Sequence, residues 1–195
     1  MRFSRIILPP LLLTALLAGC VTRINTDVIQ NPPPAEKFSA FNRFEMAKVE
    51  LVPPYAGQEA NERALLKIQE NLSYKGDPLL QGWNDAGRDA AVARTLVITP
   101  VVTEIKFIGG GARTFAGAFA GSSAVILKVT ITEKETGRIL ATPLFYARAA
   151  AMGGAWTFGA TDNLMLVRVA GRLTDYLSAN YAVAVGGRTG AELPD

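Results

Sequence analysis

Histidine is absent from this 195-residue sequence, and cysteine occurs once, as Cys20. These absences remove the most common general base, the most common zinc ligands and any disulfide within the chain. We therefore expect no metal, no cofactor and no catalytic residue, and we predict that the chain is not an enzyme. The enzymatic alternative that stays open is hydrolysis by two carboxylates, which needs neither residue type.

Long hydrophobic runs are also missing. The run near the N-terminus, Ile6–Leu17, is shorter than the roughly 18 residues that a spanning helix needs, and Pro9-Pro10 interrupts it. Arg2 and Arg5 precede the run, which is the arrangement of a cleaved signal peptide. We expect residues 1–19 to be a signal peptide and not a transmembrane helix.

A large excess of one charge is missing as well. The chain has 20 basic and 17 acidic residues, and removing Arg2 and Arg5 with the signal peptide lowers the basic count to 18. The remaining basic residues are scattered among carboxylates, and no nucleic-acid-binding motif occurs. We therefore expect no nucleic-acid partner.

The signal segment ends in Leu17-Ala18-Gly19-Cys20, which resembles the lipobox of bacterial lipoproteins. In such proteins the cysteine sulfur receives a diacylglyceryl group, the preceding segment is removed and the new amino terminus is acylated. The resemblance implies lipidation of Cys20, and several acyl chains anchor a protein stably where one does not. Val21, where an aspartate would act as a retention signal, implies attachment to the outer membrane on its periplasmic face. The alternative is an ordinary secretory signal with a chance cysteine.

Proline is concentrated directly behind Cys20, where core-forming residues are few. Residues 20–37 contain Asn31-Pro32-Pro33-Pro34, which favours extended conformations, and we predict a proline-rich linker that lifts the domain off the membrane. Residues 38–181 are long enough for a single domain with a full hydrophobic core. Residues 182–195 are predicted to be a flexible C-terminal tail.

Hydrophobic periodicity predicts the order strand, helix, three strands, helix within that domain. The first strand covers residues 44–52 with a slip at Ala47-Lys48, and the first helix covers residues 58–74, ended by Lys75-Gly76-Asp77-Pro78. Residues 79–94 are predicted to be a loop that carries Trp83 and a short alanine-rich helix. The remaining elements are strands at 95–108, 124–132 and 139–148, a turn at 133–137, and a helix at 162–179.

Runs of strands bounded by helices indicate an α+β fold, a two-layer sandwich with a mainly antiparallel sheet and the helices on one face. Alternation and helical spacing also predict which side chains face the core. The predicted inward sets are Val125, Leu127, Val129 and Ile131 in one strand and Leu166, Val169, Leu173, Tyr176 and Leu177 in the last helix. In the strand at 95–108 one alternating set is predicted, opposite Glu104 and Lys106, and it consists of Val97, Thr99, Val101, Thr103, Ile105 and Phe107.

Glycine is plentiful between two of the predicted strands, in residues 109–123. A phosphate-binding loop would need Gly-Lys-Ser/Thr or the GxGxxG spacing before a helix, and neither occurs. The segment is either a simple connection or an interaction loop, and a second glycine-aromatic segment at residues 152–159 would extend its apolar surface. The candidate interaction residues are Arg113, Phe115, Phe119, Trp156 and Phe158.

Two smaller groups of residues offer weaker chemistry. Asp85 and Asp89 are one helical turn apart, and Ca²⁺ or Mg²⁺ would suit such oxygen ligands, but a solvated helix face also explains the pair. Ser122 and Ser123 have no histidine to activate a hydroxyl, so loop polarity is the better explanation.

The region Thr99–Leu140 combines several features: Thr103-Glu104, Arg113, Gly117, Gly121, the strand Val125–Ile131 and Thr136-Gly137. This combination resembles the bacterial lipoprotein family known as domain of unknown function 4410. In that family an aspartate commonly precedes the Thr-Gly pair, and Glu133 and Glu135 occupy that neighbourhood here. The family has no established activity, so the resemblance implies an envelope lipoprotein with a small α+β domain.

The sequence as a whole therefore predicts a non-enzymatic envelope lipoprotein that acts through protein–protein contacts as an accessory or assembly factor. Its expected partners are the membrane, through the lipid anchor, and another envelope protein or a second copy of the chain. The alternative is an oligomeric secretion-channel or pore component. Strands of about 9–11 residues would then have to enter the membrane, where Glu104, Lys106 and Lys128 would have to face a lumen.

Overall fold

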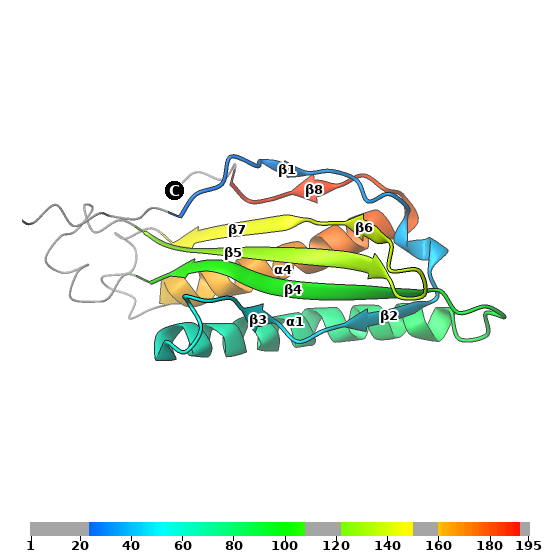
Figure 1. Cartoon of the computed structure of the whole chain (residues 1–195), viewed down its shortest axis with the longest axis horizontal. Coiled ribbons are helices and arrows are strands. Elements are labelled where there is room, and N and C mark those ends of the chain that lie inside the picture. The colour runs from blue at the N-terminus through cyan, green and yellow to red at the C-terminus, as the bar shows by residue number, and fades with distance from the viewer. Residues whose placement is uncertain (1–23, 108–121, 150–159, 192–195) are drawn as a thin grey trace, which may run out of the picture.

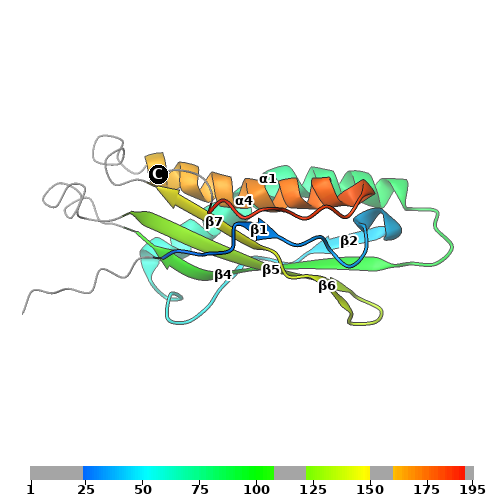
Figure 2. The same cartoon turned by 90° about the horizontal axis from the view of Figure 1, so that it is seen from above.

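The computed structural model of this chain describes residues 24–107, 122–149 and 160–191. Among these residues, helices α1 (Glu59–Ala86) and α4 (Ala160–Ala182) lie side by side on one face of a six-stranded sheet (Figures 1 and 2). This arrangement confirms the predicted α+β fold. Neither of these helices is long and apolar enough to cross a membrane.

The large sheet is mixed, although most of its pairing is antiparallel. Its centre is the antiparallel pair β4 and β5, and β6 and β7 continue the sheet on the far side of β5. On the other side, β2 and β3 both run parallel to β4, which the sequence did not predict. The strands are β2 (Arg43–Met46), β3 (Glu50–Leu51), β4 (Thr95–Lys106), β5 (Ser123–Glu133), β6 (Ile139–Ala141) and β7 (Leu144–Ala149).

The central strand β5 has the predicted orientation. Its four predicted inward side chains are each at most 1% exposed and belong to the main core, whereas Lys128 is exposed on the opposite side of the sheet. The predicted turn follows, and Gly137 has a φ of +70°, a conformation that glycine adopts without steric cost. Pro143 separates β6 from β7, because proline cannot donate to a strand ladder.

The single alternating set predicted for β4 does not hold along the whole strand. Leu96, Ile98 and Val102 are fully buried in the core. A β-bulge between Val102 and Glu104 changes the phase of the alternation, so that Ile105 lies on the buried face although it belongs to the other alternating set. The prediction continued the alternation that contains Ile105 toward the start of the strand, as if there were no bulge. Val97, Thr99 and Val101 of that set are half-buried on the other side.

Helix α1 continues where the sequence predicts a stop. It runs through Gly76 and Pro78 to Ala86, so the predicted loop at residues 79–94 begins only after residue 86. Leu72, Gly76 and Leu80 are buried at a spacing of four residues, and burial of this face outweighs the local cost of a glycine and a proline. Gly76 also permits a close approach, since a Cβ atom there would lie 3.2 Å from Met46 Cε.

The extension of α1 places Trp83 on a helix and not in a loop. Its ring stacks on Tyr181 of α4 with 4.3 Å between ring centroids, and it contacts Phe44 of β2 at 5.0 Å. Helix α4 in turn has the predicted buried face, whose five residues are each at most 3% exposed. The rings of Trp83, Tyr181 and Phe44 therefore form one aromatic cluster that joins the two helices and β2.

Side-chain amides of α1 form hydrogen bonds with the backbone at the edge of the sheet where β2 and β3 lie. Asn84 accepts a hydrogen bond from the Phe44 amide at 2.7 Å and donates one to the Phe44 carbonyl at 3.0 Å. Gln69 accepts from the Val49 amide at 2.9 Å. Backbone groups at this edge therefore have partners in the helix layer.

The predicted linker and the predicted tail both take part in the fold. Strand β1 (Gln30–Asn31) pairs antiparallel with β8 (Gly187–Arg188), and this pair lies along β7 in Figure 1. Residues 24–37, which we name the N-terminal arm, begin at the buried Ile24. The extended conformation that prolines favour suits a strand at a sheet edge as well as it suits a free linker, which is why composition misled the prediction.

Two glycines of α1 provide a test of this packing. Gly82 faces open space, so Gly82→Ala should raise the free energy of unfolding by about 1 kcal/mol through helix propensity. Gly76→Leu should lower it by about 1–3 kcal/mol, because the side chain would overlap Met46 and Thr174. Denaturant unfolding of both variants checks this, and a Gly76→Leu variant as stable as the parent would contradict the close approach.

Candidate functional site

All five candidate interaction residues lie outside the described part of the chain, in residues 108–121 and 150–159. They are Arg113, Phe115, Phe119, Trp156 and Phe158. The described residues that flank these segments lie at one end of the sheet, where Lys106 pairs with Ala124 and Ser123 pairs with Ala149. Both segments therefore leave the sheet from the same end, which we name the anchor end (Figure 1).

The N-terminal arm begins at the anchor end. Ile24 is buried against Ala124, Ile126 and Tyr146, on the face of the sheet away from the helices, which we name the outer face. The Tyr146 hydroxyl donates to the Ile24 carbonyl at 3.2 Å. Cys20 also lies outside the described residues, but it is only four residues earlier, a span of at most about 14 Å. The predicted lipid site is therefore tethered closely to this end.

Hydrogen bonds fasten the arm along the edge of β7. The Asn31 amide group donates to the Leu144 carbonyl and accepts from the Leu144 amide, each at 2.8 Å. Next along the edge, the Tyr146 amide donates to the Thr189 carbonyl at 2.8 Å, and the Thr189 hydroxyl donates to the Val28 carbonyl at 2.6 Å. The arm and the C-terminal residues thus close this edge together.

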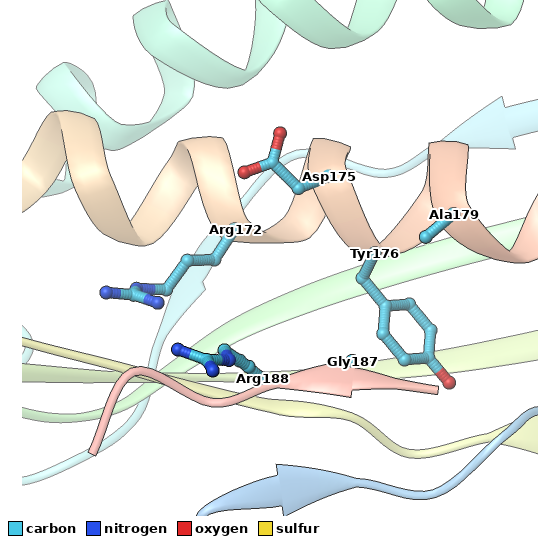
Figure 3. Close-up of a pocket in the computed structure, with 6 residues that line it drawn as sticks. All are labelled: Arg172, Asp175, Tyr176, Ala179, Gly187 and Arg188. Atoms are coloured by element: carbon cyan, nitrogen blue, oxygen red, sulfur yellow. The ribbon is translucent and has the colours of Figure 1, made fainter. Parts of the chain in front are cut away.

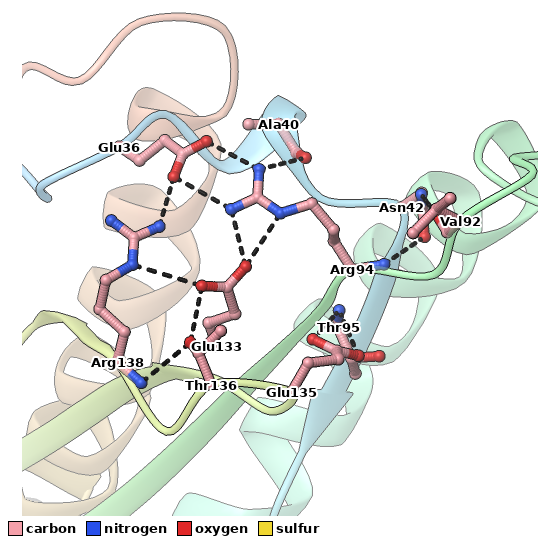
Figure 4. A network of polar contacts seen from close by, with 10 residues as sticks. All are labelled: Glu36, Ala40, Asn42, Val92, Arg94, Thr95, Glu133, Glu135, Thr136 and Arg138. Atoms are coloured by element: carbon pink, nitrogen blue, oxygen red, sulfur yellow. Dashed lines mark hydrogen bonds and ion pairs between the residues drawn. The ribbon is translucent and has the colours of Figure 1, made fainter.

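The arm ends in a network of ion pairs at the end of the sheet opposite the anchor end (Figure 4). Glu36 accepts from Arg94 Nη1 at 2.8 Å and pairs with Arg138. Glu133, whose side chain is 7% exposed, accepts from Arg94 Nε at 2.9 Å and from Arg138 Nε at 3.3 Å. The Arg94 guanidinium also lies 4.3 Å from the centroid of the Phe41 ring.

Electrostatics in this network favour the ionised carboxylates. Hydrogen bonds from Arg94, followed by those from Arg138, lower the pKa of Glu36 from 4.5 to about 2. Arg94 also lowers the pKa of Glu133, and the Thr95 amide, at 2.9 and 3.0 Å from the two carboxylate oxygens, lowers the pKa of Glu135. Groups with such low pKa values are poor proton donors or acceptors near neutral pH, so the network is suited to fixing the arm and the turn.

A pocket of about 290 Å³ lies between α4 and β8 (Figure 3). The buried Tyr176 forms part of its wall, its hydroxyl donates to the Pro32 carbonyl at 3.0 Å, and burial raises its pKa to about 12. The phenol is therefore a fixed donor to the arm and not an acid at neutral pH. The residues that line the pocket are Arg172, Asp175, Tyr176, Ala179, Gly187 and Arg188.

The weaker candidates for chemistry have ordinary structural roles. Asp85 forms an ion pair with Arg88, and the Ser122 hydroxyl accepts a hydrogen bond from Arg148 Nε. Within residues 24–107, 122–149 and 160–191, no group of three or more histidine, cysteine, aspartate or glutamate side chains is placed to hold a metal ion.

Comparison with known proteins gives structural likenesses alone, because no family model and no curated protein matches the chain. The PelC dodecamer from Paraburkholderia phytofirmans matches with a TM-score of 0.38 and 14% identity over 72% of this chain and 91% of that chain. A structure from Caulobacter crescentus assigned as a lipoprotein matches with 0.35 and 16% over 69% and 91%. A Xanthomonas campestris protein of the DUF330 family matches with 0.34 and 13% over 75% and 89%. At these values the family is not established, and the resemblance to domain of unknown function 4410 stays a prediction.

The sequence prediction missed the residues that fasten the arm. Asn31 is 2% exposed although asparagine carries no hydrophobic signal, and Glu36 has its partners 58 and 102 positions away. The available signal was the proline run itself, which is compatible with an edge strand. Its correct interpretation required knowing that backbone groups at the edge of β7 would need hydrogen-bond partners from another segment.

Replacing Asn31 tests how strongly the arm is held. Asn31→Ala removes two hydrogen bonds and leaves both backbone groups of Leu144 without that partner, so the free energy of unfolding should fall by about 2–3 kcal/mol. The control is Asn71→Ala, whose side chain bonds to the Lys67 carbonyl of its own helix and which should change stability by about 0.5 kcal/mol or less. Equal effects in the two variants would show that Asn31 has no special role.

The Glu36 network predicts a loss of stability in acid. The pKa of Glu36 is lower in the folded chain than its ordinary value, so its contribution is complete above pH 4.5 and is lost as the pH falls toward about 2. Unfolding of the parent and Glu36→Gln, followed from pH 7 to about 2, should show a smaller acid-dependent loss in the variant. Glu70→Gln, at an exposed helical ion pair, is the control, and parallel pH profiles for the parent and Glu36→Gln would refute the assignment.

Proposed function

We propose that this chain is a non-enzymatic lipoprotein, attached through Cys20 to the periplasmic face of the outer membrane, and that it acts through protein–protein contacts as an accessory or assembly factor. The observation that supports this most directly is the shared anchor end. Ile24 is buried there, and the strands that flank residues 108–121 and 150–159 end there. A lipid on Cys20 would bring the attachment points of both segments close to the bilayer.

This arrangement restricts the kind of partner. Contacts made by Phe115 or Trp156 would take place near the membrane surface, within reach of an integral outer-membrane protein or of a neighbouring lipoprotein. A partner that stays in the bulk of the periplasm would meet the opposite end, where Glu36 and its arginines lie.

A pore in which β4 and β5 extend into the membrane is less compatible with the packing. Both strands are long enough to span, with 12 and 11 residues. However, their inner face is buried in the core beneath the helices, and Lys128 is exposed on the outer face. An oligomer formed through contacts of the folded domain is the form of self-association that this packing permits.

The non-enzymatic proposal is supported by the state of the carboxylates. Glu36 and Glu133, which share the ion pairs of Arg94 and Arg138, are held ionised by these arginines. Two-carboxylate hydrolysis needs one of its carboxyl groups to remain protonated as an acid, so this pair does not meet the requirement.

The proposal is tested in two steps in cells. Metabolic labelling with a fatty acid should modify the parent chain and leave Cys20→Ser unlabelled, and a labelled Cys20→Ser would disprove the anchor. Photoreactive residues at Phe115 and Trp156 should then crosslink to a discrete envelope protein, or to a second copy if the chain self-associates. Val92, 74% exposed at the opposite end, is the matched control. Equal background adducts at all three positions would contradict contacts at the anchor end.

A further inference from the structure

We propose that the side of the domain formed by the outer face and the start of the N-terminal arm that covers it faces the bilayer at the anchor end, with Lys106 and Arg148, on either side of the covered Ala124, binding the phosphate groups of anionic phospholipids. The proposal rests on the lipid anchor at Cys20 and adds to it a defined orientation of the domain. It commits to the membrane surface as the partner of this face.

The strand register brings the two cations together. Lys106 of β4 and Arg148 of β7 both pair directly with Ala124 of β5, one on each side. Directly paired residues of neighbouring strands project from the same face of a sheet. Lys106, Ala124 and Arg148 therefore form one row across three strands on the outer face, and exposed Lys128 lies on the same face four residues along β5.

The anchor reaches the domain on this same face. Ile24 packs on Ala124, Ile126 and Tyr146, whose side chains alternate with the inward-facing residues of the core. The Cα atom of a lipidated Cys20, four residues earlier, would lie within about 14 Å of the Ile24 Cα atom. The full span is longer than the Debye length at physiological salt, about 8 Å. The row of Lys106 and Arg148 would therefore interact with phospholipid phosphates when the residues between Cys20 and Ile24 are not fully extended.

The charge differs between the two layers of the sandwich at this end. On the outer face, Glu104 is in the row next to the two cations, opposite Ile126. In the helix layer, the first turn of α1 carries Glu59 and Glu62. Lys106, Arg148 and Lys128 outnumber Glu104 on the outer face, whereas Arg63 pairs with Glu59 and leaves the first turn of α1 with the charge of Glu62. An anionic surface would therefore attract the outer face more than the first turn of α1, which favours the orientation with the sheet layer and not the helix layer toward the bilayer (Figure 2 shows the two layers).

The chemistry of the two side chains suits phospholipid phosphates. Arginine offers a planar set of donors that matches phosphate oxygens, and lysine supplies a compact positive charge. Arg148 is also positioned, because its Nε donates to the Ser122 hydroxyl. One acyl-anchored residue combined with a basic surface is a known way to strengthen and orient membrane attachment.

Lysine footprinting on the anchored protein tests the proposal. The lipidated chain is reconstituted on phosphatidylcholine vesicles with or without about 30% phosphatidylglycerol, and a membrane-impermeant reagent acetylates its lysines. Phosphatidylglycerol should slow acetylation of Lys106 roughly fivefold, and salt at about 1 M should remove the effect. Lys67 on α1 and Lys134 at the opposite end are internal controls whose rates should not change.

A charge-reversal pair identifies the surface. Arg148→Glu should reduce the protection of Lys106, whereas Arg63→Glu makes the same change of charge on the helix layer and should leave it intact. Circular dichroism confirms that both variants fold. If the parent floats with the vesicles but Lys106 reacts at one rate on both compositions, the docking surface is wrong while the anchor stands. If the parent does not float, the lipid anchor itself fails.

Discussion

Partners for the backbone groups at the two edges of the sheet are the requirement on which this structure depends. Side-chain amides supply partners at both edges: Asn84 and Gln69 of α1 bond to β2 and to Val49, and Asn31 of the arm bonds to Leu144 of β7. Because these amides belong to α1 and to the arm and not to the strands that they bond, they join the helix and the arm to the sheet in fixed positions. Closing the edges and assembling the layers are therefore the same event, and it also protects the edges from pairing with other chains.

The parts of the fold that the sequence predicts are those in which local pattern and tertiary environment agree. Strand β5 alternates without interruption, and the buried face of α4 has regular helical spacing, so both were predicted with their inward residues. Gly76 and Pro78 of α1 show the opposite case, because a strong local stop signal lies inside a helix whose buried face continues past it. The bulge after Val102 was likewise invisible, since a single inserted residue changes the phase without changing the composition.

The candidate site was predictable to a smaller extent. The tetrapeptide ending in Cys20 indicates an anchor from sequence alone, but the relation of that anchor to the glycine-aromatic segments depends on strand register and on the burial of Ile24. No periodicity connects residues 24, 106 and 148. Their proximity follows from three strands ending at one side of the sheet and from an arm that composition assigned to a linker.

The arm also determines how the domain would carry a mechanical load. It begins at the anchor end, runs along β8 and β7, and ends at Glu36 on the opposite side. Tension applied at Cys20 acts along the length of this segment, so the bonds of Asn31, Thr189 and Glu36 would share the force in shear and would not open one after another. With Cys20 as the anchor that we propose, the domain would resist unfolding when its tether is pulled.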